Sequence, residues 1–214
     1  NGYAWWYIDG IRDDNRRAVA VIAFIGSVFS PWYAWSGRRE PENNVCINVA
    51  TYGPRGRVAM TDRGLTALRQ TRDTFTVGPS SLQWKDGKLI IDIAERGALP
   101  ARGRVRGRIT VTPKTPLSDV EMPLTEDGAH IWRPFAPTCD IDVDLEEKDW
   151  QWTGHGYFAA NFGTRALEQD FTHWSWGRFP RETGSSCFYD LRRVDGSRLK
   201  TGVDFDAGGA AHLV

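Results

Sequence analysis

Residues 149–163 read Asp149-Trp150-Gln151-Trp152-Thr153-Gly154-His155-Gly156-Tyr157-Phe158-Ala159-Ala160-Asn161-Phe162-Gly163. Successive side chains of a β-strand point to opposite faces, so this stretch is interpreted with a period of two. Trp150 and Trp152 then share one face with two glycines, whereas His155, Tyr157 and Ala159 share the other with polar residues. An apolar face opposite a polar, aromatic face predicts a strand that borders a ligand-bearing cavity.

The composition predicts one large β domain, or one domain with part of another. A chain of 214 residues is long enough to bury a real core. The 27 basic and 27 acidic residues balance to a formal charge of zero, so no overall field attracts nucleic acid, and we predict no nucleic-acid partner. Ten tryptophans are the compositional outlier and predict aromatic walls around any cavity.

The cysteine pattern predicts buried free thiols in a reducing compartment. Cys46, Cys139 and Cys187 are odd in number and far apart, without Cys-x-x-Cys spacing. The longest apolar run, Ala18 to Phe29, is shorter than the ~20 residues of a membrane-spanning helix. Nothing resembles a signal peptide. We expect a soluble or membrane-peripheral protein in the cytoplasm, and we expect the native chain to extend beyond both ends of this sequence.

Turn signals divide the chain into many short strands. The clearest hairpin is centred on Asp86-Gly87, because this dipeptide supplies the positive φ angles of a type I′ turn. Pro134 and Pro137 predict a break between two strands, and Thr164 to Phe171 is predicted as a short helix. The predicted strands are Tyr3–Asp9, Arg17–Phe29, Asn44–Tyr52, Arg57–Thr61, Thr74–Val77, Ser81–Lys85, Lys88–Glu95, Arg104–Thr112, Ala129–Phe135, Cys139–Leu145, Trp150–Ala160, His173–Phe179, Ser186–Val194 and Leu199–Phe205.

This pattern is typical of an all-β fold, either an antiparallel barrel or a sandwich. The strand pattern starts again after about residue 165. We therefore predict a first β domain over residues 1–165 and the start of a second β unit, expected to be incomplete, over residues 166–214. A closed barrel of about eight strands can hold one slender apolar ligand. That is a property of the fold and does not identify a function.

Metal and nucleophile chemistry is disfavoured by the spacing of the candidate residues. His130, His155 and His173 form no i, i+2 or i, i+4 pair and no His-Glu-x-x-His motif, so we predict no metal site. A Gly-x-Ser-x-Gly elbow is missing as well. For His130 and Tyr157 the pattern leaves two interpretations open: core aromatic residues with hydrogen-bonded polar tips, or convergent polar groups in an apolar channel.

Four separated blocks carry a family resemblance: Gly2–Gly10, Val21–Tyr33, Gly154–Tyr157 and His173–Arg178. Together they resemble the acyclic carotenoid 1,2-hydratases, also called hydroxyneurosporene synthases, and the likeness runs from residue 2 to about residue 205. The resemblance implies a lipocalin-like antiparallel barrel and no cofactor. It also implies a carbon–oxygen lyase that adds water across the terminal C1–C2 double bond of acyclic carotenoids such as neurosporene and lycopene, giving a tertiary 1-hydroxy product.

The resemblance also implies roles for four positions. The family's His-x-Trp pair falls on His130 and Trp132, and its Tyr-x-Asp pair falls on Tyr157 and Ala159, where the aspartate is missing. Protonating an isolated alkene without a metal needs a strong acid, and a carboxylic acid in an apolar pocket keeps its proton. The faces of Trp132 and Tyr157 would stabilise the resulting cation. His130 would orient the acid or the attacking water.

Ala159 can donate no proton, so we interpret this chain as a catalytically impaired variant. An engineered Asp→Ala replacement is the favoured account, and a natural non-catalytic relative is the alternative. Asp190, beside Tyr189, is a candidate substitute acid. The expected substrate-binding residues are Trp152, His155, Asn161, Trp174, Trp176, Phe29 and Trp32.

The expected partners are a long acyclic carotenoid and water. Because such a substrate resides in membrane, we expect peripheral contact with the inner or photosynthetic membrane. Trp32, Trp35, Arg38 and Arg39 form the candidate docking patch, and a solvated loop is its alternative. Two other functions stay open: a lipocalin-like carrier for hydrophobic polyenes, and a polyene cyclase whose product would be isomeric with its substrate.

Overall fold

The structure is a computed structural model and describes residues 2–97 and 103–214. One helix, α1, spans Pro31–Trp35, and 3-10 turns span Pro41–Asn43, Leu65–Ala67 and Leu167–Gln169. The strands are β1 Tyr3–Arg12, β2 Ala18–Ile25, β3 Val45–Tyr52, β4 Val58–Met60, β5 Leu68–Gln70, β6 Thr74–Val77, β7 Ser80–Lys85, β8 Lys88–Arg96, β9 Arg104–Pro113, β10 Met122–Pro123, β11 His130–Leu145, β12 Gln151–Gly163, β13 Phe171–Pro180, β14 Ser185–Arg193, β15 Arg198–Phe205 and β16 Ala211–Leu213.

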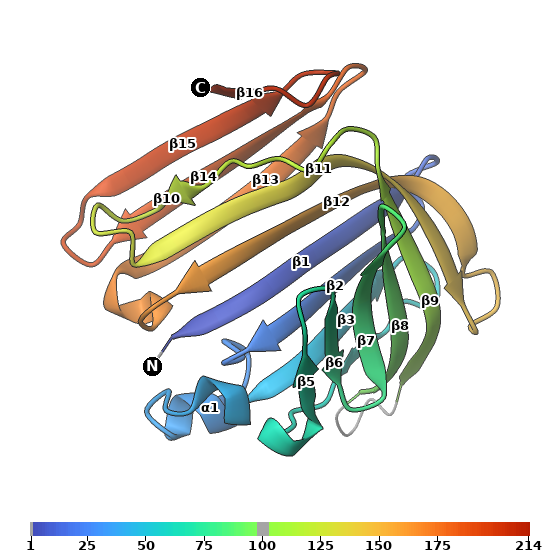
Figure 1. Ribbon diagram of the computed structural model, residues 1–214, viewed down its shortest axis with the longest axis horizontal. Coiled ribbons are helices and arrows are strands. Elements are labelled where there is room, and N and C mark those ends of the chain that lie inside the picture. Colours follow the sequence, from blue (N-terminus) through green and yellow to red (C-terminus); the bar gives the residue numbers. More distant parts are fainter. Residues whose placement is uncertain (1, 98–102) are drawn as a thin grey trace.

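The strands form two antiparallel sheets, which gives the lipocalin-like, all-β fold that the sequence predicts. The large sheet has the order β4-β3-β2-β1-β12-β11-β9-β8-β7-β6-β5, with β10 paired to β11. It curls until β4 contacts β8 and β9, so that it forms a half-barrel (Figure 1). The small sheet has the order β13-β14-β15-β16. It begins at Phe171, and a domain boundary at residue 165 stays a prediction.

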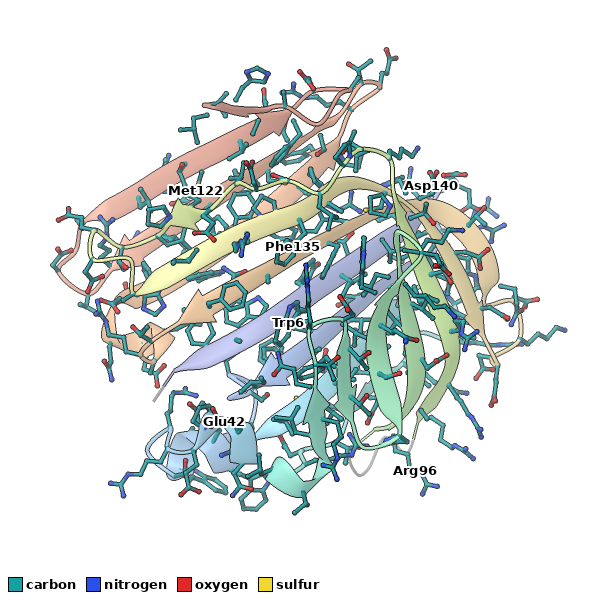
Figure 2. The ribbon with its side chains drawn as sticks, viewed as in Figure 1. Trp6, Glu42, Arg96, Met122, Phe135 and Asp140 are labelled. Atoms are coloured by element: carbon teal, nitrogen blue, oxygen red, sulfur yellow. The ribbon has the colours of Figure 1, made fainter. Side chains whose placement is uncertain are left out.

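Alternation along β1 assigns the two faces of the curled sheet. Trp6 and Ile8 belong to the core inside the curl, and Figure 2 shows Trp6 and Phe135 on the strands that form its concave side. Tyr7, between them in sequence, belongs instead to a second cluster with residues of the small sheet. Met122 of β10 is buried in this second cluster. The small sheet therefore packs on the outer face of β1, β11 and β12.

A buried ion pair joins the half-barrel across its curl. Arg63 forms an isolated bridge with Val45, and its guanidinium donates two hydrogen bonds to Glu95 of β8, at 3.1 and 2.9 Å. The Glu95 side chain is fully buried and also accepts a bond from Ser80 at 2.6 Å. Because a buried carboxylate is tolerated only when paired and hydrogen-bonded, these contacts account for Glu95 inside the curl.

The hairpin at Asp86-Gly87 is confirmed, with φ angles of 51° and 73° at these two residues. The predicted break at Pro134 and Pro137 is wrong, because β11 continues through both prolines. Its pairing with β12 shifts register on either side of Ala136, and such irregularities accommodate residues that lack a backbone N–H. The buried free cysteines are confirmed at Cys46, Cys139 and Cys187.

Two helix assignments differ from prediction. Residues 164–171 form only the 3-10 turn Leu167–Gln169, because so short a helix is marginal without tertiary support and Phe171 instead enters β13. The helix α1 was missed, although Pro31 occupies its first turn and Ser30 accepts a bond from the Tyr33 N–H. The short strands β5, β10 and β16 were also missed. Among the described residues, no helix has the length and apolarity needed to cross a membrane.

Candidate functional site

A cavity of about 310 Å³ lies between the outer face of the curled sheet and the small sheet. Its walls come from β1, β2, β11 and β12 on one side and from β13 and β14 on the other. The residues that line it are Trp5, Tyr7, Ile22, Phe24, Val28, Phe29, Trp132, Tyr157, Ala159, Asn161, Leu167, Trp174, Trp176 and Tyr189. This composition matches the apolar aromatic walls that the ten tryptophans predict.

The strand register explains how residues distant in sequence meet in this wall. Trp132 pairs with Asn161 of β12, Asn161 with Trp5 of β1, and Trp5 with Phe24 of β2. These four side chains form one row on the outer face. In the next row, Tyr7 lies between Ala159 and Ile22. The period-two pattern of residues 149–163 thus placed Tyr157, Ala159 and Asn161 on the face that borders the cavity.

Trp132 and Tyr157 contact each other in the wall of the cavity. The Trp132 indole Nε1 donates a hydrogen bond to the Tyr157 hydroxyl at 3.2 Å, and both side chains are fully buried. Burial, with smaller contributions from Cys187 and Tyr189, holds the pKa of Tyr157 well above its ordinary value. The phenol therefore stays neutral and offers its aromatic face to the cavity.

Ala159 occupies the centre of this wall and is 2% exposed. Directly opposite it on β1 stands Tyr7, whose pKa is raised by burial and then by Asp9. Asn161 donates from its amide to the Tyr189 hydroxyl at 3.1 Å. Among the described residues that line the cavity, none carries a carboxyl group. A carboxylic acid introduced at position 159 would meet the apolar and phenolic side chains of this wall and the Asn161 amide.

His130 is fully buried beside the cavity and does not line it. Its Nε2 lies 2.8 Å from Asp170 Oδ2, and its Nδ1 lies 2.8 Å from the Tyr3 hydroxyl. A carboxylate only accepts, so Nε2 carries a proton, and in the neutral ring Nδ1 accepts from Tyr3. Arg165 donates to both Asp170 oxygens, at 2.6 and 2.8 Å. The sequence prediction missed Asp170, because nothing in its spacing connects it to His130.

An ion pair joins β13 to β1 beside Tyr157. Arg178 of β13 donates from Nε to Asp9 of β1 at 2.7 Å, and its guanidinium carbon lies 5.8 Å from the Tyr157 ring centroid. His155 Nδ1 lies 3.5 Å from the same guanidinium. Burial first, and then Arg178, lowers the pKa of His155. The sequence prediction missed this pair, although Trp5, Tyr7 and Asp9 alternate on β1 just as Trp174, Trp176 and Arg178 alternate on β13.

The structure brings together four of the expected substrate-binding residues and separates three. Phe29, Asn161, Trp174 and Trp176 line the cavity. Contrary to expectation, Trp152 lies on the opposite face of β12, inside the curled sheet, because the period-two alternation that puts Tyr157 outward puts Trp152 inward. His155 contacts Arg178. Trp32 projects from α1 with 61% of its surface exposed, because a helix of five residues presents it to solvent.

Asp190, the candidate substitute acid, does not line the cavity. It follows Tyr189 on β14 and therefore points to the opposite face of that strand. There it accepts a hydrogen bond from Arg198 Nε at 2.6 Å. Arg198 holds the pKa of Asp190 below its ordinary value, which favours the ionised carboxylate.

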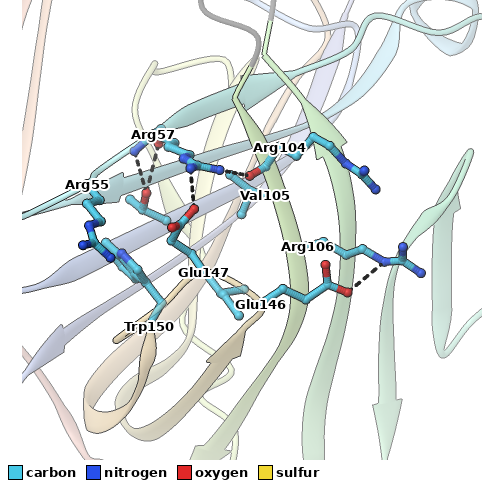
Figure 3. A pocket seen from close by; sticks show the side chains of 10 residues that line it. Arg55, Arg57, Arg104, Val105, Arg106, Glu146, Glu147 and Trp150 are labelled. Carbon is cyan, nitrogen blue, oxygen red and sulfur yellow. Dashed lines mark hydrogen bonds and ion pairs between the residues drawn. The ribbon is translucent and has the colours of Figure 1, made fainter.

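Two other hollows lack the predicted catalytic residues. One, of about 340 Å³, opens inside the curled sheet beside Trp6 and Phe75. The other, of about 230 Å³, lies near the β11–β12 turn (Figure 3). Its rim is polar, with Arg57 paired to Glu147 and Arg106 paired to Glu146 at 3.3 Å. An apolar substrate therefore fits the cavity between the sheets better than the polar hollow.

The Asp170 contacts predict an acid-sensitive step in stability. Arg165 first, and then His130, lowers the pKa of Asp170 below 3.8, so the folded state binds fewer protons than the unfolded state. The stabilisation is present above the ordinary pKa and is lost as the pH falls through the lowered value. We expect Asp170→Asn to lose less unfolding free energy than the parent between about pH 7 and about pH 3, as measured by urea denaturation. Asp13→Asn, in an exposed turn, is the control, and parallel losses in parent and Asp170→Asn would contradict the assignment.

Comparisons with known proteins show the family of this chain. A family model for the carotenoid hydratase CrtC matches residues 21–214. The acyclic carotenoid 1,2-hydratase of Cereibacter sphaeroides is 58% identical over 194 residues, which cover 91% of this chain and 69% of that protein. The enzyme of the same name from Rhodobacter capsulatus is 56% identical over 190 residues, covering 89% of this chain and 67% of that protein.

A solved structure supports the fold alone. The crystal structure of a protein described as AttH from Nitrosomonas europaea has a TM-score of 0.60 at 14% identity, covering 99% of this chain and 67% of that one. The family resemblance predicted from the sequence is confirmed by the family model and by the two close relatives. The chain therefore belongs to the carotenoid hydratase family.

Proposed function

We propose that this chain has the fold and cavity of an enzyme that hydrates the terminal C1–C2 double bond of acyclic carotenoids such as neurosporene and lycopene. The observation that carries the proposal is the position of Ala159. It stands in an apolar aromatic wall beside the Trp132–Tyr157 pair, where the family resemblance requires an aspartic acid. The product would be a tertiary 1-hydroxy carotenoid, and no cofactor takes part.

The proposed reaction needs one acid, one water and an aromatic wall. A protonated aspartic acid at position 159 gives its proton to C2, which leaves a tertiary cation at C1. Water adds to C1, and the proton that it loses restores the acid. The faces of Trp132 and Tyr157 would stabilise the cation by up to about 2 kcal/mol each in a desolvated site. With Ala159 in place the first step has no donor, so this chain is impaired.

The size of the cavity fits one end of a polyene and not the whole molecule. Its volume of about 310 Å³ lies at the lower limit of ligand pockets, which span roughly 300–1,000 Å³. Phe29 lines the cavity and is 55% exposed, so the rest of the substrate would leave past this residue. We propose that one terminal double bond is bound between the sheets while the chain of the polyene extends outward.

A carrier for hydrophobic polyenes is the second candidate function. It is favoured by one observation, the lack of a carboxyl group among the described residues of the cavity wall. Turnover after Ala159→Asp separates the candidates. A product heavier by one water supports the hydratase, a product isomeric with lycopene supports a cyclase, and binding without turnover supports the carrier.

We also propose that the cavity mouth contacts a membrane surface, at which a cytoplasmic protein would collect its substrate. Trp32 and Trp35 are 61% and 73% exposed and pack edge to face with centroids 5.0 Å apart. Phe29 at the mouth lies three residues before Trp32, and Arg39 beyond α1 is exposed. Trp side chains and basic residues together are typical of interfacial binding.

We expect Trp32→Ala/Trp35→Ala to reduce binding to vesicles at least about tenfold, because burying each aromatic side chain is worth about 1.5–3 kcal/mol. Co-sedimentation with vesicles containing anionic lipid measures the effect. Tyr52→Ala, which removes another exposed aromatic residue at the end of β3 (56%), is the control. Equal binding by the double variant and the parent would contradict a docking role for α1.

A further inference from the structure

Five aromatic rings beside the cavity form a closed circuit across the two sheets. His130 packs on Tyr3 with centroids 5.7 Å apart, and Tyr3 stacks on Trp5 at 4.6 Å. Trp5 meets Trp174 at 6.1 Å, Trp174 meets Phe171 at 5.3 Å, and Phe171 returns to His130 at 5.2 Å. Of these five rings, Trp5 and Trp174 line the cavity. The other three lie behind them as a support.

The circuit is anchored by the two hydrogen bonds of His130. One goes to Tyr3, the ring that supports Trp5. The other goes to Asp170, which immediately precedes Phe171, the ring that supports Trp174. The curled sheet and the first strand of the small sheet are therefore tied to the same imidazole.

Two neighbours hold this anchor in place. Arg165 donates to Asp170 and also to Asp127 Oδ2, the latter at 2.6 Å. Gly163 lies between His130 and Tyr3 in the strand register. A Cβ at Gly163 would stand 2.2 Å from Tyr3 Cε1 and 2.9 Å from His130 Nδ1. The missing side chain is thus what lets Tyr3 reach His130.

Both ring nitrogens of His130 are occupied by protein partners, and its side chain has no exposed surface. Neither nitrogen is therefore in direct contact with water or with the cavity. We infer that His130 is a positioning residue: its bonds to Tyr3 and Asp170 set the separation of Trp5 and Trp174, the walls that hold the end of the polyene. This inference rests on the proposed function for its substrate.

Two variants test the anchor without removing His130. Tyr3→Phe keeps the ring and deletes one hydrogen bond, whereas Gly163→Ala forces Tyr3 and His130 apart and keeps every titrating group. Both are made in an Ala159→Asp background. Positioning of the walls predicts a KM for lycopene raised about tenfold, a kcat within about twofold, and an unchanged shape of the pH profile. If His130 exchanges a proton with the reactants, Tyr3→Phe changes kcat and moves a limb of the pH profile at constant KM, and the inference is overturned.

Gly156→Ala on the same strand is the matched control, because its Cβ would meet Ile141 and the Asp9 carbonyl at 3.1 and 3.2 Å, away from the circuit. A second readout needs no turnover. Quenching of tryptophan fluorescence measures the binding of lycopene to the chain that carries Ala159. We expect Tyr3→Phe and Gly163→Ala to weaken binding about tenfold while circular dichroism reports an intact fold. If Ala159→Asp shows no hydration, the proposed function fails. The binding measurement still tests the positioning role of His130, and unchanged lycopene affinity in both variants would overturn that role.

Discussion

Ala159→Asp is expected to hydrate lycopene and neurosporene, whereas the parent chain is expected to show no turnover. The new carboxyl group would occupy a site that is 2% exposed and faces Tyr7. Desolvation there disfavours the anion, which keeps the acid protonated near neutral pH. General acid catalysis by one positioned side chain contributes about 10²–10⁴-fold, so we expect at least a hundredfold gain in product. Chromatography with mass detection measures the gain of one water.

Two control variants isolate the proton as the cause of the gain. Ala159→Asn has nearly the shape of aspartate and no acidic proton, so it is expected to remain without turnover. Ala160→Asp places the same acid one residue further on, at a buried position on the opposite face of β12. It is expected to destabilise the fold without hydrating lycopene. If Ala159→Asp and Ala159→Asn both lack turnover while binding the substrate, position 159 does not hold the acid.

The period-two pattern predicted which residues share a face but not what covers that face. It placed Tyr157, Ala159 and Asn161 together, and the cavity lies against them. It could not show that the cover is a second sheet bearing Trp174 and Trp176, because alternation within a strand carries no information about packing between sheets. The sequence pattern was compatible with a ligand inside a closed barrel. The cavity at the candidate site lies instead on the outer face of the curled sheet, under the small sheet.

The polar residues that support the site were the least predictable. Asp170 contacts His130 and Arg165 contacts Asp170, and both come from a segment that was predicted to be helical. Asp9 and Arg178 come from opposite ends of the chain and meet only because β1 and β13 pack across the cavity. Local propensity describes neighbours in sequence, and each of these contacts is made by tertiary packing.

The second large effect is expected from Arg178→Met, which leaves the Asp9 carboxylate without its partner. The side chains of Arg178 and Asp9 are 5% and 13% exposed, so little water replaces the lost guanidinium. Removing one member of a buried ion pair typically costs about 3–5 kcal/mol. For a chain of this size, each kcal/mol lowers Tm by about 2–4 °C, so a fall of roughly 6–20 °C is expected in a thermal melt.

A control variant and a double variant distinguish the effect of breaking the buried ion pair on stability from the effect of losing one positive charge. Arg181→Met breaks the pair with Asp204, whose side chains are 50% and 25% exposed, and such surface pairs contribute about 0–1 kcal/mol. Asp9→Asn/Arg178→Met removes both charges and is expected to regain most of the lost stability, because the penalty comes from the unpaired buried charge. If the double variant is as unstable as Arg178→Met, the loss does not come from the unpaired Asp9 carboxylate, and the ion pair does not account for the stability of the contact between the two sheets.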